Sequence, residues 1–553
     1  MTKPSDHSNM LDRRSVLISG SAAVAALSLT SARAMAATNM VVETRYGKFA
    51  GVAEGRALAF HGVPYGASTG GRNRFMPPAS PAPWSGVRSA PKNRIIAPQE
   101  DPMPAPARAP SPFDAILGGI STADATESED CLNLDIWTPA LDTGKRPVMV
   151  WLHGGGFGIG AGSLPAYNGA RLSSTGDVVV VNVTHRLNVL GYLDLSPAGQ
   201  DFAASGMVGM LDIVAALEWV RDNIAQFGGD PDNVMIFGES GGGAKVGILM
   251  AMPKAKGLFH RAAIQSGAMR RVMEKPEAAQ LTGALAAELG LRSDQAREIQ
   301  AVPLPRLMAA HFSALRKGGM GAMMGFSPVL DGTLLPQHPF DPVASPLSAD
   351  IPLIIGSNMT ETTLFAQGDL PAFDLDENGL KTRLAATMGP LTGTQALNLY
   401  KSLYPSDTPA DLYFKITTDR GAGLASTRVA ELKSAQGGAP VFLYEFHFTT
   451  PVMDNRLRSP HGLEVPMVFN DPGSRTNVAL TGGGQRTLDM AASMSAAWVA
   501  FARSGRPDTV RLEWPAYDPI HRSTMIFDTN SEARTDPARS IRRFWTEAGE
   551  RMI

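Results

Sequence analysis

The chain has 553 residues, of which 44% are hydrophobic and 18% are charged. Its 50 Lys and Arg side chains nearly balance its 52 Asp and Glu side chains, so the formal net charge is only −2. This balance excludes a disordered polyelectrolyte and provides no positive field for a nucleic-acid backbone. The 56 Gly and 41 Pro residues form no repeat, which indicates many loops on a globular body.

The first 36 residues predict an export signal rather than a part of the fold. The pair Arg13-Arg14 precedes a mild apolar run at 16–29, which is too short to span about 30 Å of hydrocarbon. An Ala-Met-Ala triplet at 34–36 then fits a signal-peptidase site. The paired arginines favour a twin-arginine signal over 1–36, with an ordinary secretory signal or a short membrane anchor as alternatives. We expect a periplasmic or secreted protein without a membrane span in the mature chain.

Cys131 is the single cysteine, so the chain cannot form an internal disulfide. Exported proteins often use disulfides, and a chain without them agrees with folding in the cytosol before export. A catalytic thiol needs an electropositive and accessible site, and nothing beside Cys131 in the sequence suggests one. We predict a buried structural thiol.

The first elements after the signal are short. Residues 41–51 predict an antiparallel hairpin that turns at Gly47. Residues 69–112 have the composition of a loop, and the proline-rich part at 98–112 excludes a helix or a central strand. This part is either an ordered surface loop or a mobile flap, and the sequence leaves both open.

The body of the chain shows short, continuous apolar runs, the pattern of strands that are buried on both faces of a parallel sheet. These runs lie at 148–152, 178–183, 234–237, 262–264 and 352–355. Helical periodicity appears between them, as over 210–220. A late strand at 441–446 and a late amphipathic helix at 490–503 follow.

The alternation of strands and helices predicts an α/β fold with a large, mostly parallel, doubly wound sheet. We expect a single domain over 37–553. Helical, cap-like segments at about 274–322 and 374–436 are expected above the carboxyl edge of the sheet. This edge is where parallel α/β sheets bind their ligands.

The sharpest signal is the sequence 238–242, Gly-Glu-Ser-Gly-Gly, directly after the apolar run at 234–237. It fits the G-x-S-x-G pattern, in which a tight strand–turn–helix requires small neighbours and exposes the serine. The hydroxyl of Ser240 would then stand at a helix N-terminus, where the dipole favours a developing anion. The alternative is a glycine-rich turn with a serine that caps the helix.

A second glycine-rich loop follows the run at 148–152. In the sequence 153–156, His-Gly-Gly-Gly, the missing side chains let backbone N–H groups approach a substrate carbonyl, so the loop predicts an oxyanion hole. A phosphate-binding loop is the alternative, but no G-K-[ST] follows and no dinucleotide spacing is present.

Together these segments resemble the type B carboxylesterase family, which also contains acetylcholinesterase and bacterial esterases. The family's N-terminal pattern, E-D-C-L signature, oxyanion loop, serine signature and H-G-x-E segment are matched at 60–65, 128–137, 153–157, 237–242 and 459–464. The resemblance implies the α/β-hydrolase fold and a serine carboxylic-ester hydrolase that works through an acyl-enzyme. It implies no metal and no organic cofactor.

Three departures from the family pattern stand out. Gly241 follows the nucleophile where the family usually has alanine. Cys131 of the E-D-C-L signature has no partner cysteine, and Thr362 follows the expected acid where the family usually has glycine.

The remaining catalytic residues follow from chain order, which in this fold is serine, acid and histidine. His461 lies in a loop and matches the family histidine, whereas His447 alternates within a strand and is more typical of a structural residue. Glu361 follows the run at 352–355 at the family's position for the acid. Its rival, Asp331, is typical of a turn.

We expect Ser240 to attack an ester carbonyl while His461 takes its proton and Glu361 orients His461. The expected oxyanion donors are the N–H groups of Gly155, Gly156 and Gly241. By resemblance, further residues should support the histidine or form structural ion pairs: Glu239, Ser266 and Glu464 near the site, and the pairs Arg74–Glu129 and Arg186–Asp212.

The substrate is expected to be a neutral, small-molecule ester, and the protein is expected to be a monomer or a small homo-oligomer. Between 85 and 130 the sequence has no Trp or Tyr to stack on a quaternary ammonium, and Phe113 is the sole aromatic residue. This argues against a choline ester.

The acyl side of the site is expected to accept bulky or aromatic groups. Ala322 and Met324 stand at positions that resemble the cholinesterase acyl pocket, and Leu364 and Phe365 should line the opposite wall. The alternative is that the methionines only pack the core. Thioester, amide or lipid cleavage by the same residues stays open, as does a non-catalytic, cholinesterase-like binding protein.

Overall fold

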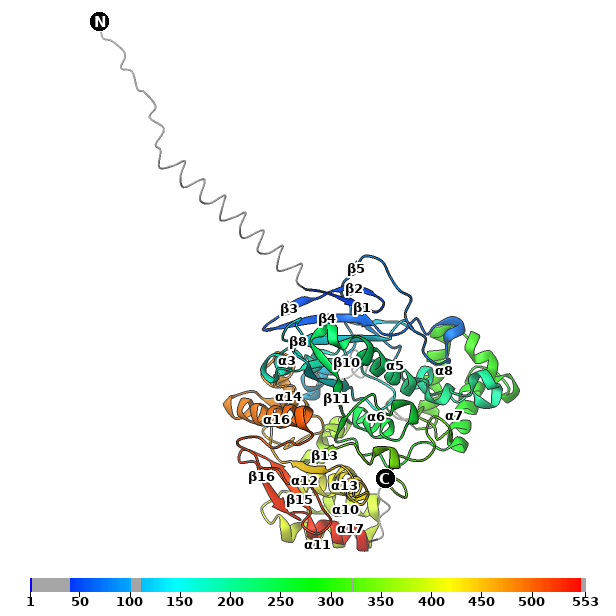
Figure 1. Cartoon of the computed structure of the whole chain (residues 1–553). Helices are drawn as coiled ribbons and strands as arrows, with labels where there is room; N and C mark the ends of the chain where they lie inside the picture. The colour runs from blue at the N-terminus through cyan, green and yellow to red at the C-terminus, as the bar shows by residue number, and fades with distance from the viewer. Residues whose placement is uncertain (2–39, 101–110, 320–322, 324, 549–553) are drawn as a thin grey trace.

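The computed structural model describes Met1 and residues 40–100, 111–319, 323 and 325–548 (Figure 1). The predicted signal at 1–36 and most of the proline-rich segment lie outside the described residues. A mixed sheet of 11 strands runs through the molecule in the order β16-β15-β14-β13-β12-β11-β9-β10-β8-β4-β3. The strands are β3 Val52–Glu54, β4 Ala57–Pro64, β8 Asn133–Thr138, β9 Arg146–Leu152, β10 Val179–Thr184, β11 Gly229–Glu239, β12 Arg261–Gln265, β13 Leu353–Asn358, β14 Val441–Phe446, β15 Ser523–Phe527 and β16 Glu532–Thr535.

The centre of the sheet is parallel and its margins are antiparallel. Strands β10, β9, β11, β12, β13, β14 and β15 pair in parallel, in that order across the sheet. β8, β4 and β3 add antiparallel strands at one edge, and β16 adds one at the other. The apolar runs of the sequence form these central strands, so the prediction of a mostly parallel, doubly wound sheet is confirmed.

Two small sheets lie beside the main one. β1 (Val41–Thr44) and β2 (Gly47–Ala50) form the predicted antiparallel hairpin, and β2 pairs in parallel with β5 (Val87–Arg88). β6 (Ile95–Ile96) pairs with β7 (Thr126–Glu127). The loop-like stretch around 69–112 therefore holds only two-residue strands and a short 3₁₀ turn among its described residues.

Helices cover both faces of the sheet (Figure 1). Their bounds are α2 Phe113–Leu117, α3 Ala170–Gly176, α4 Asn188–Tyr192, α5 Val208–Asn223, α6 Gly241–Leu249, α7 Lys275–Glu288, α8 Leu304–Lys317, α9 Thr362–Phe365, α10 Glu377–Met388, α11 Pro390–Leu403, α12 Pro409–Thr418, α13 Leu424–Ser434, α14 Val465–Val468, α15 Val478–Thr481, α16 Gln485–Ser504 and α17 Arg539–Glu547. α7 and α8 lie in the first predicted helical segment, and α10 to α13 lie in the second.

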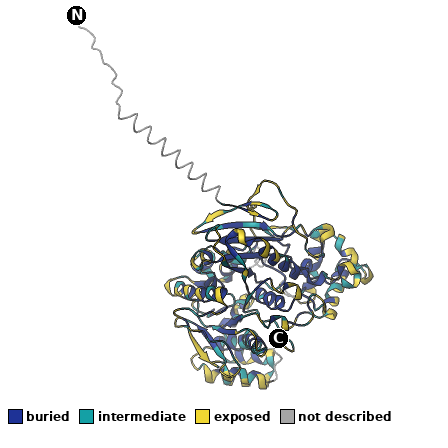
Figure 2. Ribbon diagram, viewed as in Figure 1, coloured by how far each residue is buried: buried dark blue, intermediate teal, exposed yellow. Residues whose placement is uncertain are grey.

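Side chains of one strand pack into two separate hydrophobic cores, because successive residues of a strand point to opposite faces of the sheet. On β9, Val148 and Val150 join the core under α5 and α6, whereas Met149 and Trp151 join the core under α3 and α16. Figure 2 shows the buried strands enclosed by helices that are exposed on their outer sides. Burial on both faces explains the continuous apolar runs of the sequence.

Two ion pairs, one partly buried and one fully buried, anchor the loops around the central strands, as the resemblance implies. Arg74 Nε lies 2.6 Å from Glu129 Oε1, and Arg186 Nη2 lies 2.6 Å from Asp212 Oδ1. The Arg186 and Asp212 side chains are only 2% and 0% exposed, so their charges depend on one another. Cys131 is buried beside this pair, and burial raises the pKa of its thiol, as expected for a structural cysteine.

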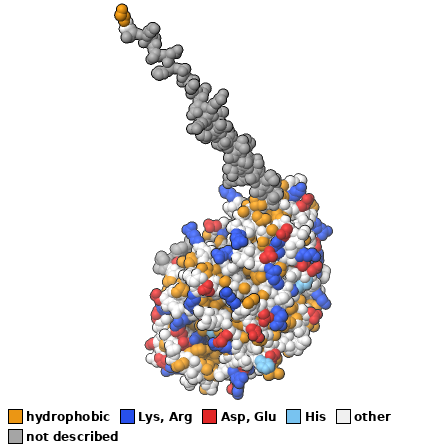
Figure 3. Space-filling view, turned by 60° about the vertical axis from the view of Figure 1, so that its left-hand side comes forward, with side chains coloured by type: hydrophobic (Ala, Val, Ile, Leu, Met, Phe, Trp, Pro, Cys, Tyr) orange, Lys and Arg blue, Asp and Glu red, His pale blue; other side chains and the backbone are white. Residues whose placement is uncertain are grey.

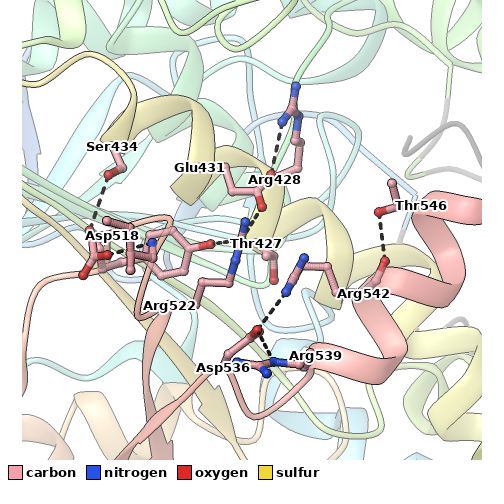
Figure 4. Close-up of polar contacts among 12 residues, drawn as sticks. Thr427, Arg428, Glu431, Ser434, Asp518, Arg522, Asp536, Arg539, Arg542 and Thr546 are labelled. Carbon is pink, nitrogen blue, oxygen red and sulfur yellow. Dashed lines mark hydrogen bonds and ion pairs between the residues drawn. The ribbon is translucent and has the colours of Figure 1, made fainter.

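The C-terminal helix α17 is held by shared carboxylates (Figure 4). Asp536 accepts hydrogen bonds from Arg539 Nε at 3.0 Å and from Arg542 Nη2 at 2.8 Å. Glu431 on α13 pairs in the same way with Arg428 and Arg522. Asp536 thus ties α17 to the turn after β16, and Glu431 ties α13 to the segment before β15.

One helical stretch among the described residues, Gln200–Phe227, is long and apolar enough to cross a membrane by length and composition. Its most apolar part is 78% buried inside the fold. It contains α5, which packs on the sheet. On the face shown in Figure 3, basic and acidic side chains are interspersed, which agrees with the small net charge.

Candidate active site

Ser240 lies between the end of β11 and the first turn of α6, with a strained backbone of φ 56° and ψ −125°. The neighbouring glycines are required by close packing. A Cβ on Gly238 would lie 2.5 Å from the Gly242 carbonyl carbon, and a Cβ on Gly242 would lie 1.9 Å from the Leu152 oxygen. The strand–turn–helix that G-x-S-x-G predicts is therefore present.

The glycine loop after β9 brings free backbone donors to the same place. Gly155 and Gly156 have φ values of 86° and 61°, the left-handed region that glycine adopts without strain. Within the described part of the chain, the N–H groups of Gly155, Gly156 and Gly241 donate no hydrogen bond. Three unoccupied donors beside Ser240 suit an anionic oxygen.

His461 is paired with Glu361. Its Nδ1 atom lies 2.5 Å from Glu361 Oε2, and Glu361 Oε1 accepts a hydrogen bond from the N–H of Asn358 at 2.6 Å. Glu361 is 2% exposed and follows β13, while His461 lies in the loop after β14. The pairing fixes the ring, as the acid of a serine hydrolase does.

Two further carboxyl groups approach His461. Nε2 of His461 lies 3.0 Å from Glu239 Oε1, and Glu464 Oε2 accepts a 2.6 Å hydrogen bond from Asn358 Nδ2. No hydrogen bond joins Ser240 and His461 among the described residues, although both line one cavity. In this arrangement, Nε2 faces Glu239.

The buried carboxyl groups set the protonation of this cluster. Burial raises the pKa of Glu239 to about 8 and that of Glu464 to about 7. Burial disfavours the His461 imidazolium, but Glu239 and Glu361 outweigh burial and raise the pKa of His461 to about 10. A carboxyl group that holds its proton no longer favours the imidazolium, so the neutral imidazole needed by a base depends on Glu239 and Glu464.

Ser266 follows β12, beside the elbow, with φ 50°. Its N–H donates to the Gly356 oxygen at 2.9 Å, and its buried hydroxyl has no partner in the described part of the structure. Ser266 does not line the cavity that holds Ser240 and His461.

The cavity beside Ser240 has a volume of about 310 Å³, and the ionisable side chains among its described lining residues are Glu239, His461 and Tyr167. The predicted wall residues Leu364 and Phe365 line it, and the Phe365 ring lies 4.8 Å from the His461 ring. Ala322 and Met324 lie outside the described residues. The rest of the wall is mainly aliphatic and includes Ile116, Leu117, Ile120, Ile159, Met323, Val465 and Leu480.

The rival residues have structural contacts. Asp331 accepts hydrogen bonds from the N–H groups of Thr333, Leu334 and Leu335, so it is the turn residue that the sequence suggests. Thr362, where the family usually has glycine, bonds through its hydroxyl to Thr417 at 2.8 Å and so ties the loop of Glu361 to α12.

Asn358, which ends β13, is a functional residue that is not among the predicted ones. Its N–H binds Glu361, and its side chain binds Glu464 and the Pro460 oxygen at 2.7 Å. A polar residue at the end of an apolar strand, three positions before the acid, was the available signal. No group of three or more His, Cys, Asp or Glu side chains is placed to hold a metal among the residues described.

The fold and this site define a serine hydrolase of the α/β-hydrolase class. The model of the carboxylesterase family matches residues 38–545, and the chain belongs to this family. The enzyme is a carboxylesterase.

Similar proteins and solved structures agree with this family assignment. The chain is 34% identical over 501 residues to the para-nitrobenzyl esterase of Bacillus subtilis, covering 90% of this chain and 97% of that one. It is 32% identical over 515 residues to the phenmedipham hydrolase of Pseudarthrobacter oxydans, covering 91% and 98%. A carboxylesterase structure from Geobacillus stearothermophilus superposes with a TM-score of 0.76 at 36% identity, covering 92% of this chain and all of that one.

Glu239→Gln keeps the side-chain size and removes the charge beside His461 Nε2. Because that charge favours the imidazolium, the pKa of His461 should fall, and the acid limb of the kcat/KM profile should move to lower pH by about one unit. The profile is measured with an aryl ester over roughly pH 5 to 11, which brackets the pKa of His461 before and after the change.

Glu445→Gln is the matched control, because Glu445 Oε2 lies 3.0 Å from His447 Nε2 in a second Glu–His pair that does not line the cavity. Its profile should equal that of the native enzyme. If the Glu239→Gln profile also overlays the native one, Glu239 does not influence the protonation of His461.

Proposed function

We propose that Ser240, His461 and Glu361 hydrolyse carboxylic esters through an acyl-enzyme. The observation that carries this proposal is the convergence of a strained, half-buried serine, a Glu-paired histidine and three unoccupied N–H donors on one cavity. The mature chain's family membership supports it.

In the proposed reaction, Ser240 Oγ attacks the ester carbonyl and His461 Nε2 accepts the Ser240 proton. This step requires Nε2 to leave Glu239 and reach Ser240, a contact that commonly forms only when substrate is bound. The oxyanion then accepts hydrogen bonds from Gly155, Gly156 and Gly241. His461 passes the proton to the leaving alcohol, and water releases the acid by the same route.

The proposed substrates are neutral esters with bulky or aromatic groups. The cavity wall is mainly aliphatic, and Phe365 provides an exposed aromatic face, with half of its surface accessible. The para-nitrobenzyl and phenmedipham relatives support this choice by their names. Ala322 and Met324 are proposed to complete the acyl side.

We also propose that residues 1–36 direct export by the twin-arginine route. The pair Arg13-Arg14 and the Ala-Met-Ala triplet at 34–36 support this proposal. The family match begins at residue 38, directly after the expected cleavage site.

Ser240→Ala should lower kcat by about 10⁴-fold or more, because the nucleophile is lost. Thermal unfolding should stay near the native midpoint, since the change is small. Ser266→Ala is the matched control, a serine with positive φ at the end of the neighbouring strand, and it should keep a readily measured turnover. Native-like turnover by folded Ser240→Ala would refute the proposed nucleophile.

Acetylcholine and 3,3-dimethylbutyl acetate have the same shape and differ in charge, so they test the alcohol side of the cavity. We expect the neutral ester to have a kcat/KM at least about tenfold higher, because Tyr167 and Phe365 are the only Phe, Tyr or Trp side chains among the described wall residues, too few to enclose an ammonium and replace its hydration. A p-nitrophenyl series from acetate to benzoate tests the acyl side, where benzoate should be accepted. Preference for the choline ester, or a strict limit to acetate, would contradict this reading.

A further inference from the structure

Lys245 on α6 has no part in the mechanism above, yet it is fully buried at 0% exposure, five residues after Ser240. Lysine is rarely buried without a specific partner. Here the partners are backbone carbonyls of the oxyanion loop. Nζ donates to the His153 oxygen at 3.0 Å and to the Gly156 oxygen at 2.9 Å.

These two carbonyls flank the donors of the expected oxyanion hole. Between them, the Gly154 oxygen lies 2.8 Å from His153 Nδ1, and the Gly155 oxygen accepts from the N–H groups of Gly158 and Ile159. All four carbonyls of 153–156 are thus occupied. The C=O of one residue and the N–H of the next share one planar peptide, so the Gly154 and Gly155 carbonyls set the N–H directions of Gly155 and Gly156, and Lys245 fixes the peptide on each side of them.

Gly241 is the second part of this contact. A Cβ on Gly241 would lie 2.2 Å from the Gly156 oxygen and 2.5 Å from the Gly156 Cα. The carbonyl that Lys245 binds therefore lies directly over the residue where the family usually has alanine. The loop approaches α6 this closely only because residue 241 has no side chain.

We propose that Lys245 is a positioning residue that clamps the oxyanion loop onto the nucleophile helix, and that Gly241 is its structural counterpart. The clamp aligns the N–H groups of Gly155 and Gly156 with that of Gly241. This inference rests on the proposed esterase function of Ser240.

The electrostatic surroundings suit such a clamp. Burial lowers the pKa of Lys245 to about 7, and the nearby Glu239 carboxyl opposes this change. Burial and the Lys245 charge lower the pKa of His153 and of His185, so both stacked rings stay neutral. Two carbonyls need two N–H donors, which an ammonium and a neutral amine both supply, so the clamp persists across this titration.

The test is Lys245→Met, which keeps the length of the side chain and removes its donors. We expect kcat for a p-nitrophenyl ester to fall by about 10²-fold with KM within about threefold, because loop alignment acts on the transition state. The Ki of an aryl trifluoromethyl ketone, whose adduct places an oxyanion in the hole, should rise by a similar factor.

Lys433→Met is the matched control. Lys433 is also 0% exposed, and its Nζ donates to the carbonyls of Ala349 and Ala439 at 3.0 and 3.3 Å, before β13 and β14 begin. This contact lies at the amino ends of its strands, whereas Ser240 lies at the carboxyl end of β11. Lys433→Met should lower thermal stability while kcat and Ki stay native.

If Lys245→Met loses stability as Lys433→Met does but keeps native kcat and Ki, Lys245 only packs the core and the inference is wrong. Gly241→Ala gives a second test that does not require the Lys245→Met variant to fold. Residue 241 begins α6, where alanine is a better helix former than glycine, so we expect this variant to fold. Its Cβ should displace the Gly156 carbonyl and lower kcat with little change in KM. If Gly241→Ala has native kcat and Ki, the oxyanion loop does not need to approach α6 as closely as we propose.

Failure of the proposed function would look different. In that case the native enzyme itself would neither hydrolyse the ester nor bind the ketone, and Ser240→Ala would change neither measurement. If the native enzyme hydrolyses the ester and binds the ketone, and the Lys245→Met and Gly241→Ala variants do so equally well, only the proposed clamp is wrong.

Discussion

The site depends on one close backbone contact, between the loop that follows β9 and the first turn of α6. Leu152, His153 and Gly156 pack so near Gly241 and Gly242 that a single methyl group at either glycine would overlap backbone atoms. This contact holds Ser240 in its strained conformation and places the N–H donors of two loops on one side of it. The strain at Ser240 persists because the surrounding parallel strands are buried on both faces and cannot relax.

A second constraint is the burial of charge beside this contact. Glu239, Glu361 and Glu464 surround one imidazole, and Asn358 joins two of them. Taking three carboxylates out of water is costly, so burial raises the pKa of Glu239 and of Glu464, and the His461 charge opposes this change. The cluster therefore acts as a unit, in which Glu361 orients His461 and the other two groups adjust how readily it accepts a proton.

Much of this arrangement follows from local patterns. The central strands are apolar because both of their faces are covered, and the elbow requires glycines wherever a Cβ would collide. Glu361 and His461 follow from chain order and from the ends of β13 and β14. The contact of Asn358 with Glu464, the contact of Glu239 with His461 Nε2 and the partners of Lys245 join segments distant in sequence, and no local pattern encodes these contacts.

The most direct test of the account is to trap the nucleophile in the native enzyme with an organophosphate and locate the adduct by peptide mass mapping. We expect one adduct per chain, on Ser240, with activity lost in proportion to labelling. An adduct on another residue such as Ser266, or full ester hydrolysis by a protein that takes up no label, would contradict it.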